Sequence, residues 1–279
     1  GADTVIGDVA LGDLVNLDAG NDNFDYRAIA ITGDVRGGAG TDTITVLADA
    51  GAVNLNLNAT SGNGVYSGFE NISASGANGV ITATALATGS TITTGTANDD
   101  VTAGGAADSI STGDGDDTVR ITSSTYANDT LTGGNNTGAG DTLAITGGGP
   151  IDLSVGVTVS GFEKVTIDNS VANVFTAHDA ALAITVSGGS VGANITLGDG
   201  FAQSVTISGT GNDTVVGGSG VNNINTGDGS DTVTNVGASD VVDLGAGSDT
   251  FGYQILGTAS VHGGDGTDTI TYTGGGSIT

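Results

Sequence analysis

The sequence predicts an all-β fold, a right-handed parallel β-roll or β-helix, which is a solenoid that completes a coil about every 18 to 20 residues. Two observations lead to this prediction. A nine-residue unit of glycine, an acidic residue and an apolar residue recurs in phase, and short repeats of fixed period are typical of solenoids. The 279 residues include 52 glycines and only 4% aromatic residues, so a large conventional core is not expected.

The longest array of repeats covers residues 208–252 and contains five nine-residue units without a gap. In every unit the sixth residue is Asp or Asn and the eighth is apolar. A second array of three units begins at Thr94. Complete single units begin at Gly37 (GGAGTDTIT) and Gly263 (GGDGTDTIT), and a weaker pair is carried by Asp13 and Asp22.

Each unit is predicted to form a turn followed by a very short strand. Glycine at positions two and four permits positive φ, and the Thr-rich segment after the acid has β propensity, with the position-eight side chain facing inward. Two units complete one coil, so units of equal parity stack. The acids should therefore form ladders, with Asp213, Asp231 and Asp249 on one edge and Asn222 and Asp240 on the other, and with Asp99 on Asp117 and Asp108 across from them.

Stacked carboxylates favour a bound cation. Rungs about 4.8 Å apart repel by roughly 3 to 4 kcal/mol at an effective dielectric of about 20. The available ligands are oxygens, which suit Ca²⁺ or Mg²⁺ better than zinc, copper or iron. A metal-free β-helix in which these residues only form solvated turns is the alternative. The predicted metal-binding residues are Asp22, Asp42, Asp99, Asp108, Asp117, Asp213, Asp231, Asp240, Asp249 and Asp268, with Gly38, Gly40, Gly113, Gly115, Gly209, Gly211, Gly227, Gly229, Gly245, Gly247, Gly264 and Gly266.

The repeat resembles the calcium-binding unit GGxGxDxUx of the RTX (repeats-in-toxin) proteins. The arrangement of GGDGTD units, GFE segments, sparse lysine and absent cysteine is most similar to RTX-type bacterial surface-layer proteins and long RTX adhesins. The resemblance implies several bound Ca²⁺ ions as cofactors. It also implies a secreted protein, exported by type I secretion to the extracellular bacterial cell surface.

Some units depart from the pattern. Asn222 replaces the position-six Asp, and Val236 replaces the position-two glycine. Position four holds alanine in three units: Ala97, Ala106 and Ala238. We expect sites that use Asn222 or the loop 236–238 to be weak or empty.

A larger repeat is visible in two near copies, SGFENIS from Ser67 and SGFEKVT from Ser160. If all residues coil at about 18 to 20 per turn, the chain forms one continuous solenoid of about fourteen coils. In each copy the Phe is expected in the core and the Glu in solvent or on a strand. The expected parts are residues 1–36 (end of a preceding unit), 37–132 (unit one, calcium turns 94–120), 133–262 (unit two, calcium turns 208–252) and 263–279 (start of a third unit).

The composition limits the possible partners. Four Lys and Arg stand against 31 Asp and Glu, a formal charge of −27, and this balance argues against nucleic acid and anionic membranes. No run of 18 apolar residues occurs, so no membrane insertion is expected. Other copies of the chain, in a lattice, in a filament or stacked end to end, and cell-surface polysaccharide are the expected partners.

We expect no enzyme. His178 beside Asp179 suggests a catalytic pair, but no nucleophile-elbow motif accompanies it. The favoured function is a calcium-dependent structural protein of the cell surface, such as an S-layer, lattice or filament subunit. The stalk of a large RTX adhesin, acting in surface attachment or biofilm formation, is the alternative. Ice or carbohydrate binding is less favoured, because the Thr210 and Asn212 row does not continue into the next coil, at Asp228 and Ser230.

Overall fold

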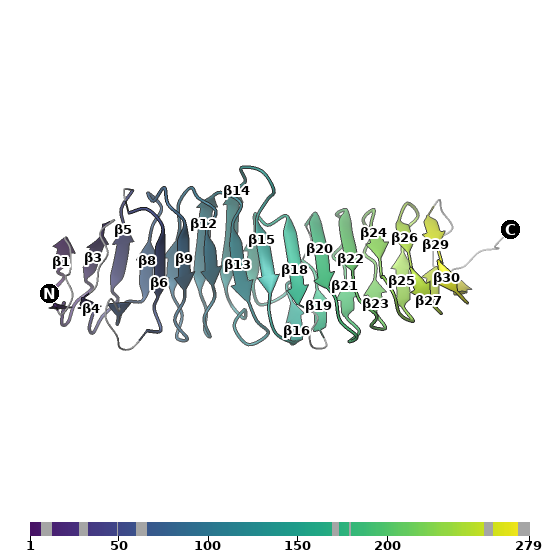
Figure 1. Ribbon diagram of the computed structural model, residues 1–279, viewed down its shortest axis with the longest axis horizontal. Coiled ribbons are helices and arrows are strands. Elements are labelled where there is room, and N and C mark those ends of the chain that lie inside the picture. The colour runs from purple at the N-terminus through teal and green to yellow at the C-terminus, as the bar shows by residue number, and fades with distance from the viewer. Residues whose placement is uncertain are drawn as a thin grey trace. The chain divides into compact units, whose positions relative to one another are not determined.

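The structure is a computed structural model that describes residues 1–6, 13–27, 33–48, 50–59, 66–168, 173–178, 180–253 and 259–272. Every regular element among these residues is a β-strand, and all the strand pairs are parallel (Figure 1). The strands stack as a β-solenoid of about 12 turns with roughly 20 residues in each. The predicted all-β parallel solenoid is confirmed.

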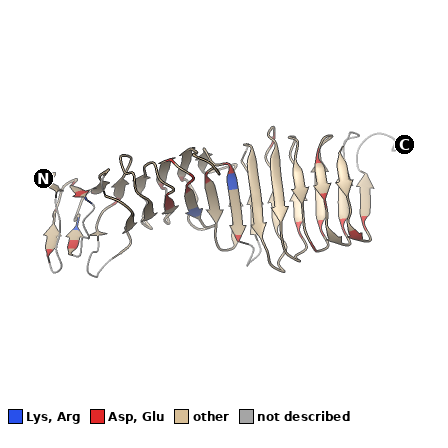
Figure 2. Cartoon of the chain, turned by 45° about the horizontal axis from the view of Figure 1, so that its top comes forward, with Lys and Arg blue, Asp and Glu red and all other residues tan. Residues whose placement is uncertain are grey.

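The number of coils is smaller than expected because some coils are long. The rung after Asp42 is Glu70, 28 residues later, and the rung after Asp117 is Asp141, 24 residues later. Acidic residues recur at the ends of strands, whereas Lys and Arg are few (Figure 2). None of the described residues forms a helix long and apolar enough to cross a membrane.

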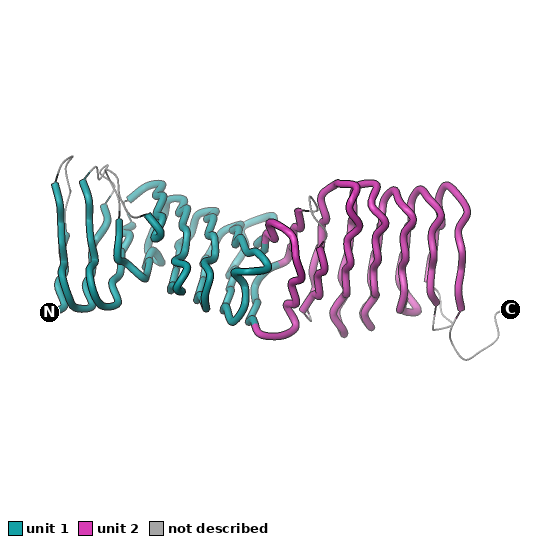
Figure 3. The backbone as a smooth tube through the Cα atoms, turned by 90° about the horizontal axis from the view of Figure 1, so that it is seen from below, with its two compact units in different colours: residues 1–143, 157–162 teal, residues 144–156, 163–279 magenta. Residues whose placement is uncertain are grey.

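The chain divides into two compact units, and the first contains residues 1–143 and 157–162 (Figure 3). Its eight-stranded sheet runs in the order β1 (Thr4–Ile6), β3 (Asn23–Tyr26), β5 (Thr43–Val46), β8 (Asn71–Ser73), β10 (Thr91–Thr93), β12 (Ser109–Asp114), β14 (Thr130–Asn135) and β17 (Thr158–Ser160). Its other strands are β6 (Val53–Asn56), β9 (Ile81–Thr84), β11 (Asp100–Thr102) and β13 (Thr118–Ile121) in one sheet, and β2 (Leu14–Asn16), β4 (Asp34–Arg36) and β7 (Tyr66–Ser67) in another.

The second unit contains residues 144–156 and 163–279. One sheet orders β16 (Gly149–Asp152), β19 (Asn173–Thr176), β21 (Asn194–Thr196), β23 (Thr214–Val216), β25 (Thr232–Val236), β28 (Thr250–Tyr253) and β31 (Thr269–Tyr272). Another contains β18 (Lys164–Asp168), β20 (Leu182–Ser187), β22 (Gln203–Ile207), β24 (Asn223–Asn225), β26 (Val241–Asp243) and β29 (Ser260–His262), and β27 (Ala246–Gly247) pairs with β30 (Asp265–Gly266). The strand β15 (Thr142–Ile145) lies where the chain passes between the units.

The core is a narrow stack of apolar side chains, as the alternation of the strands predicts. The position-eight residues of the two arrays are buried, and in β6 Val53 and Leu55 are buried while Asn54 and Asn56 are exposed. Phe69 and Phe162 are also buried, as expected. In the unit from Gly263, however, Ile270 is 70% exposed, because β31 is the last described strand of its sheet.

Strand register confirms the predicted parity. Thr214 pairs with Thr232, and Thr232 with Thr250, so the acids that precede these residues stack on one edge. Asn223 pairs with Val241 in a different sheet, which places Asn222 and Asp240 on the other edge. The same rule places Asp99 and Asp117 together, because Asp100 pairs with Thr118.

Candidate metal sites

Acidic side chains form ladders at the edges of the sheets, one rung to a coil. In unit 2, Asp231 Oδ1 accepts the N–H of Asp213 at 2.8 Å, and Asp249 Oδ1 accepts the N–H of Asp231 at 2.8 Å. Asp268 Oδ1 continues the ladder by accepting the N–H of Asp249 at 3.2 Å. One oxygen of each carboxylate therefore accepts a backbone N–H from the preceding coil, and this hydrogen bond fixes the stacking of the rungs.

Unit 1 has ladders of the same construction. On the eight-stranded sheet, Asp22 N–H donates to Asp42 Oδ1 at 2.8 Å, and Asp42 N–H donates to Glu70 Oε2 at 2.7 Å. Further along this edge, Asp108 N–H donates to Asp129 Oδ1 at 2.8 Å. On the other edge, Asp99 N–H donates to Asp117 Oδ1 at 2.7 Å, and Asp117 N–H to Asp141 Oδ1 at 2.8 Å.

Three of these rungs were not predicted as sites. Asp129 and Asp141 lie outside the nine-residue arrays, although each opens an Asp-Thr-Leu step like those of the repeat. Glu70 was expected in solvent or on a strand, but its carboxylate occupies the ladder position above Asp42. The GFE segment marks Glu70 in the sequence, but its place in the ladder depends on a coil that is longer than the repeat.

The second carboxylate oxygen distinguishes one group of acids from the others. In this group Oδ2 is buried and accepts no hydrogen bond from the described residues, and each residue is at most 2% exposed. A buried carboxylate oxygen without a partner is costly unless a cation or a proton compensates it. Burial also raises the pKa of Asp117 and Asp129 to about 6, although a hydrogen bond with the Thr112 side chain acts on the pKa of Asp117 in the opposite direction. The group consists of Asp22, Asp42, Asp117, Asp129, Asp231 and Asp249.

The turns before most of these acids contain glycines with positive φ, as predicted. Gly227 and Gly229 have φ of 84° and 148°, and Gly245 and Gly247 have 93° and 152°. These glycines stack so closely that a Cβ on Gly247 would clash with the carbonyl oxygen of Gly229. The carbonyl oxygens of one coil thus point toward the next. Positive φ occurs at predicted positions two and four at Gly38, Gly40, Gly113, Gly115, Gly209, Gly227, Gly229, Gly245, Gly247, Gly264 and Gly266.

We define open turns as those with positive φ at positions two and four and an unpartnered Oδ2 at position six. They end at Asp22, Asp42, Asp117, Asp231 and Asp249, and Asp18 takes the place of the position-two glycine in the first, with φ of 66°. In closed turns a backbone N–H of the turn donates to Oδ2 instead. These donors are Gly95 to Asp99 at 3.2 Å, Gly104 to Asp108 at 2.6 Å and Gly237 to Asp240 at 2.7 Å.

The open turns fit a hard cation. Among the described residues no three Asp, Glu or His side chains converge on one point, so side chains alone do not form a metal centre. In the pairs Asp22–Asp42 and Asp231–Asp249, the two consecutive acids and the turn carbonyls nevertheless supply only oxygen atoms, and Oδ2 of each acid is buried and accepts no hydrogen bond from the described residues. Such a set suits Ca²⁺, which takes six to eight oxygen ligands, including backbone carbonyls.

Comparison with known proteins adds no further assignment. The chain matches no protein-family model, and it matches none of the curated proteins. Of the His178 and Asp179 pair considered for catalysis, Asp179 lies outside the described residues. The functional argument therefore rests on the ladders and their turns.

Proposed function

We propose that the protein is a calcium-dependent extracellular structural protein of a bacterial cell surface, a subunit of an S-layer, lattice or filament that folds and assembles on binding Ca²⁺ after secretion. The observation that supports this most is the column of buried, unpartnered Asp Oδ2 atoms beside glycine-turned carbonyls. We infer no catalytic role.

The residues that would hold the ions belong to the open turns. In unit 2 these are Asp231 and Asp249 with the glycines of their turns, and in unit 1 they are Asp22, Asp42 and Asp117. A bound ion supplies positive charge to buried carboxylate oxygens. The chain's own residues do the positioning, because the N–H to Oδ1 bonds set the rungs and the turn glycines allow successive coils to approach closely.

Calcium would act as the folding signal. A chain with 31 acids, four Lys and Arg and few aromatic residues repels itself, so in the absence of a cation the expanded state is favoured. Ions that bind only the folded chain stabilise it by mass action, and extracellular calcium sites have dissociation constants of about 10⁻⁴ to 10⁻³ M. Low calcium inside the cell would keep the chain extended for export.

The test is a calcium titration from chelator to about 10 mM, following hydrodynamic radius and far-ultraviolet circular dichroism. We expect an expanded chain to become compact and β-rich, with Mg²⁺ a poor substitute. A chain that is compact and β-rich in chelator, and unchanged by calcium, would overturn the proposal.

Assembly is tested by electron microscopy of the purified protein with calcium. We expect ordered sheets or filaments. Isolated particles at all calcium concentrations would favour the alternative role, the stalk of an RTX adhesin.

A further inference from the structure

Two neutral side chains hold consecutive rungs on one edge of unit 2. Gln203 begins β22 and Asn222 immediately precedes β24, and both are at most 2% exposed. We name this pair the amide edge. The opposite edge carries Asp213, Asp231 and Asp249, which we name the acidic edge.

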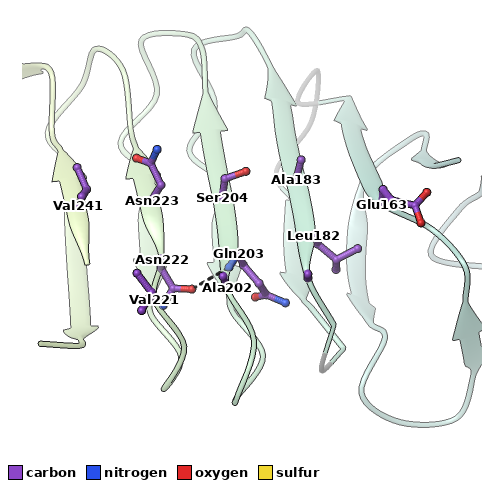
Figure 4. A pocket seen from close by; sticks show the side chains of 11 residues that line it. Glu163, Leu182, Ala183, Ala202, Gln203, Ser204, Val221, Asn222, Asn223 and Val241 are labelled. Carbon is purple, nitrogen blue, oxygen red and sulfur yellow. Dashed lines mark hydrogen bonds between the residues drawn. The ribbon is translucent and has the colours of Figure 1, made fainter. Parts of the chain in front are cut away.

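The orientation of Asn222 is fixed by its neighbours. The Oδ1 of Asn222 accepts the backbone N–H of Gln203 at 3.3 Å (Figure 4). The backbone N–H of Asn222 donates to Asp240 Oδ1 at 2.7 Å. Because Oδ1 must face a donor, Nδ2 faces the turn, where it donates to the carbonyl oxygens of Gly220 at 3.2 Å and Gly218 at 3.4 Å. These glycines hold positions four and two of the unit.

Gln203 is satisfied in a similar way. Its Nε2 donates to the carbonyl oxygens of Ala180 at 2.7 Å and His178 at 3.2 Å, and its Oε1 accepts the N–H of Gly198 at 2.9 Å. The adjacent groove of about 430 Å³ is lined mainly by apolar and amide side chains, with Glu163 its one acidic residue (Figure 4). The amide edge thus meets turn carbonyls with N–H donors, whereas the acidic edge leaves Oδ2 of Asp231 and Asp249 unpartnered.

We propose that the amide nitrogens of Asn222 and Gln203 take the place of a cation, so that the amide edge is a calcium-independent seam of the solenoid. The proposal rests on calcium binding at the open turns. It adds that unit 2 binds ions only along the acidic edge, while hydrogen bonds within the protein hold the other edge together.

The test uses Asn222→Asp, with Asn223→Asp as a matched control that adds the same charge at an exposed neighbour. Melting is followed in calcium and in chelator, both with trimethylamine N-oxide, an osmolyte that favours the compact chain so that the metal-free form also folds. Bound calcium is counted by titration calorimetry. We expect Asn222→Asp to lose roughly 5 °C of Tm in chelator relative to the control, because a carboxylate then faces two carbonyls. Calcium should restore much of this loss. Equal Tm values for the two variants in chelator would overturn the proposal.

The reciprocal variant is Asp231→Asn, with Asp228→Asn as its exposed control. We expect Asp231→Asn to bind fewer ions than the control and to melt higher than it in chelator, since an amide now meets the turn carbonyls. A lower Tm in chelator would overturn the proposal even if Asn222→Asp fails to fold. If the wild-type chain binds no calcium, the proposed function fails, while the chelator comparison of Asn222→Asp with Asn223→Asp still decides the role of the amide.

Discussion

The turns that end at Asp99 and Asp117 lie on one edge of the same sheet, yet only one of them leaves an oxygen free. Both aspartates are buried rungs, but Asp99 Oδ2 accepts the N–H of Gly95, whereas Asp117 Oδ2 has no partner among the described residues. The position-four residue differs: Ala97 in the first turn, and Gly115, at φ of 153°, in the second. A buried acid in the ladder therefore does not by itself leave an oxygen unpartnered, because the turn decides what faces its second oxygen.

The same contrast separates the edges of unit 2. The acidic edge has open turns at Asp231 and Asp249, and the other edge has Gln203, Asn222 and the closed turn at Asp240. Under the proposed calcium binding, a metal-dependent edge and a metal-independent edge belong to the same coils, since the N–H to Oδ1 bond is common to both.

The largest loss of stability is expected when a Cβ is added to a stacked glycine of an open turn. In Gly245→Ala the new Cβ would meet the backbone of Gly227, whereas in Gly200→Ala, at the similar φ of 83°, nothing lies within 4 Å. We expect a loss of about 1 to 2 kcal/mol of unfolding free energy for Gly200→Ala from the left-handed backbone alone. Gly245→Ala should lose about 3 to 5 kcal/mol, because the steric clash adds to that strain. Urea denaturation in calcium measures the unfolding free energy of both variants. Equal losses would contradict the close approach of the Gly227 and Gly245 backbones.

Removing the acid should affect open and closed turns differently. In Asp240→Ala the N–H groups of Asn222 and Gly237 lose their acceptor, which should cost about 1 to 3 kcal/mol with or without calcium. In Asp231→Ala only the N–H of Asp213 loses its acceptor. The stability gained on adding calcium should fall as well, because a proposed ligand is lost. The measurement is the difference in Tm between calcium and chelator for each variant, with the same osmolyte in both buffers so that the metal-free chain folds. An equal reduction of this difference in both would argue against two kinds of turn.

Much of the fold and part of the site could be predicted from the sequence, for identifiable reasons. The buried Val233 and the stacking of Asp213 on Asp231 follow from strand alternation and from two units per coil. The rung at Glu70 could not be predicted, because its position depends on the path of a 28-residue coil. The three closed turns coincide with the position-four alanines Ala97, Ala106 and Ala238, so the sequence marks these turns. It does not show that a backbone N–H of the turn faces the second oxygen.

A smaller effect is expected from opening a closed turn. Ala97→Gly places glycine at position four of the turn before Asp99 and allows positive φ there. We expect additional calcium binding, with a change in chelator of less than about 1 kcal/mol. The control is Ala107→Gly, which adds a glycine at position five of the turn before Asp108. Calorimetric titration compares the two, and identical calcium binding would show that position four does not govern the site.

The smallest change in stability is expected from pH in metal-free buffer that contains the same osmolyte, so that the chain is folded. Burial raises the pKa of Asp117, Asp129 and Asp213 to about 6 in the folded chain, above the ordinary value of an unfolded aspartate. The folded state therefore binds protons more tightly than the unfolded state, so stability should rise as pH falls from about 7.5 through 6. A proton on the buried oxygen partly replaces the cation, and we expect Tm to increase by a few degrees at about pH 5. With saturating calcium the trend should reverse, because protons compete with the ion for the same oxygens. A metal-free Tm that falls between these pH values would mean that the buried oxygens already have partners.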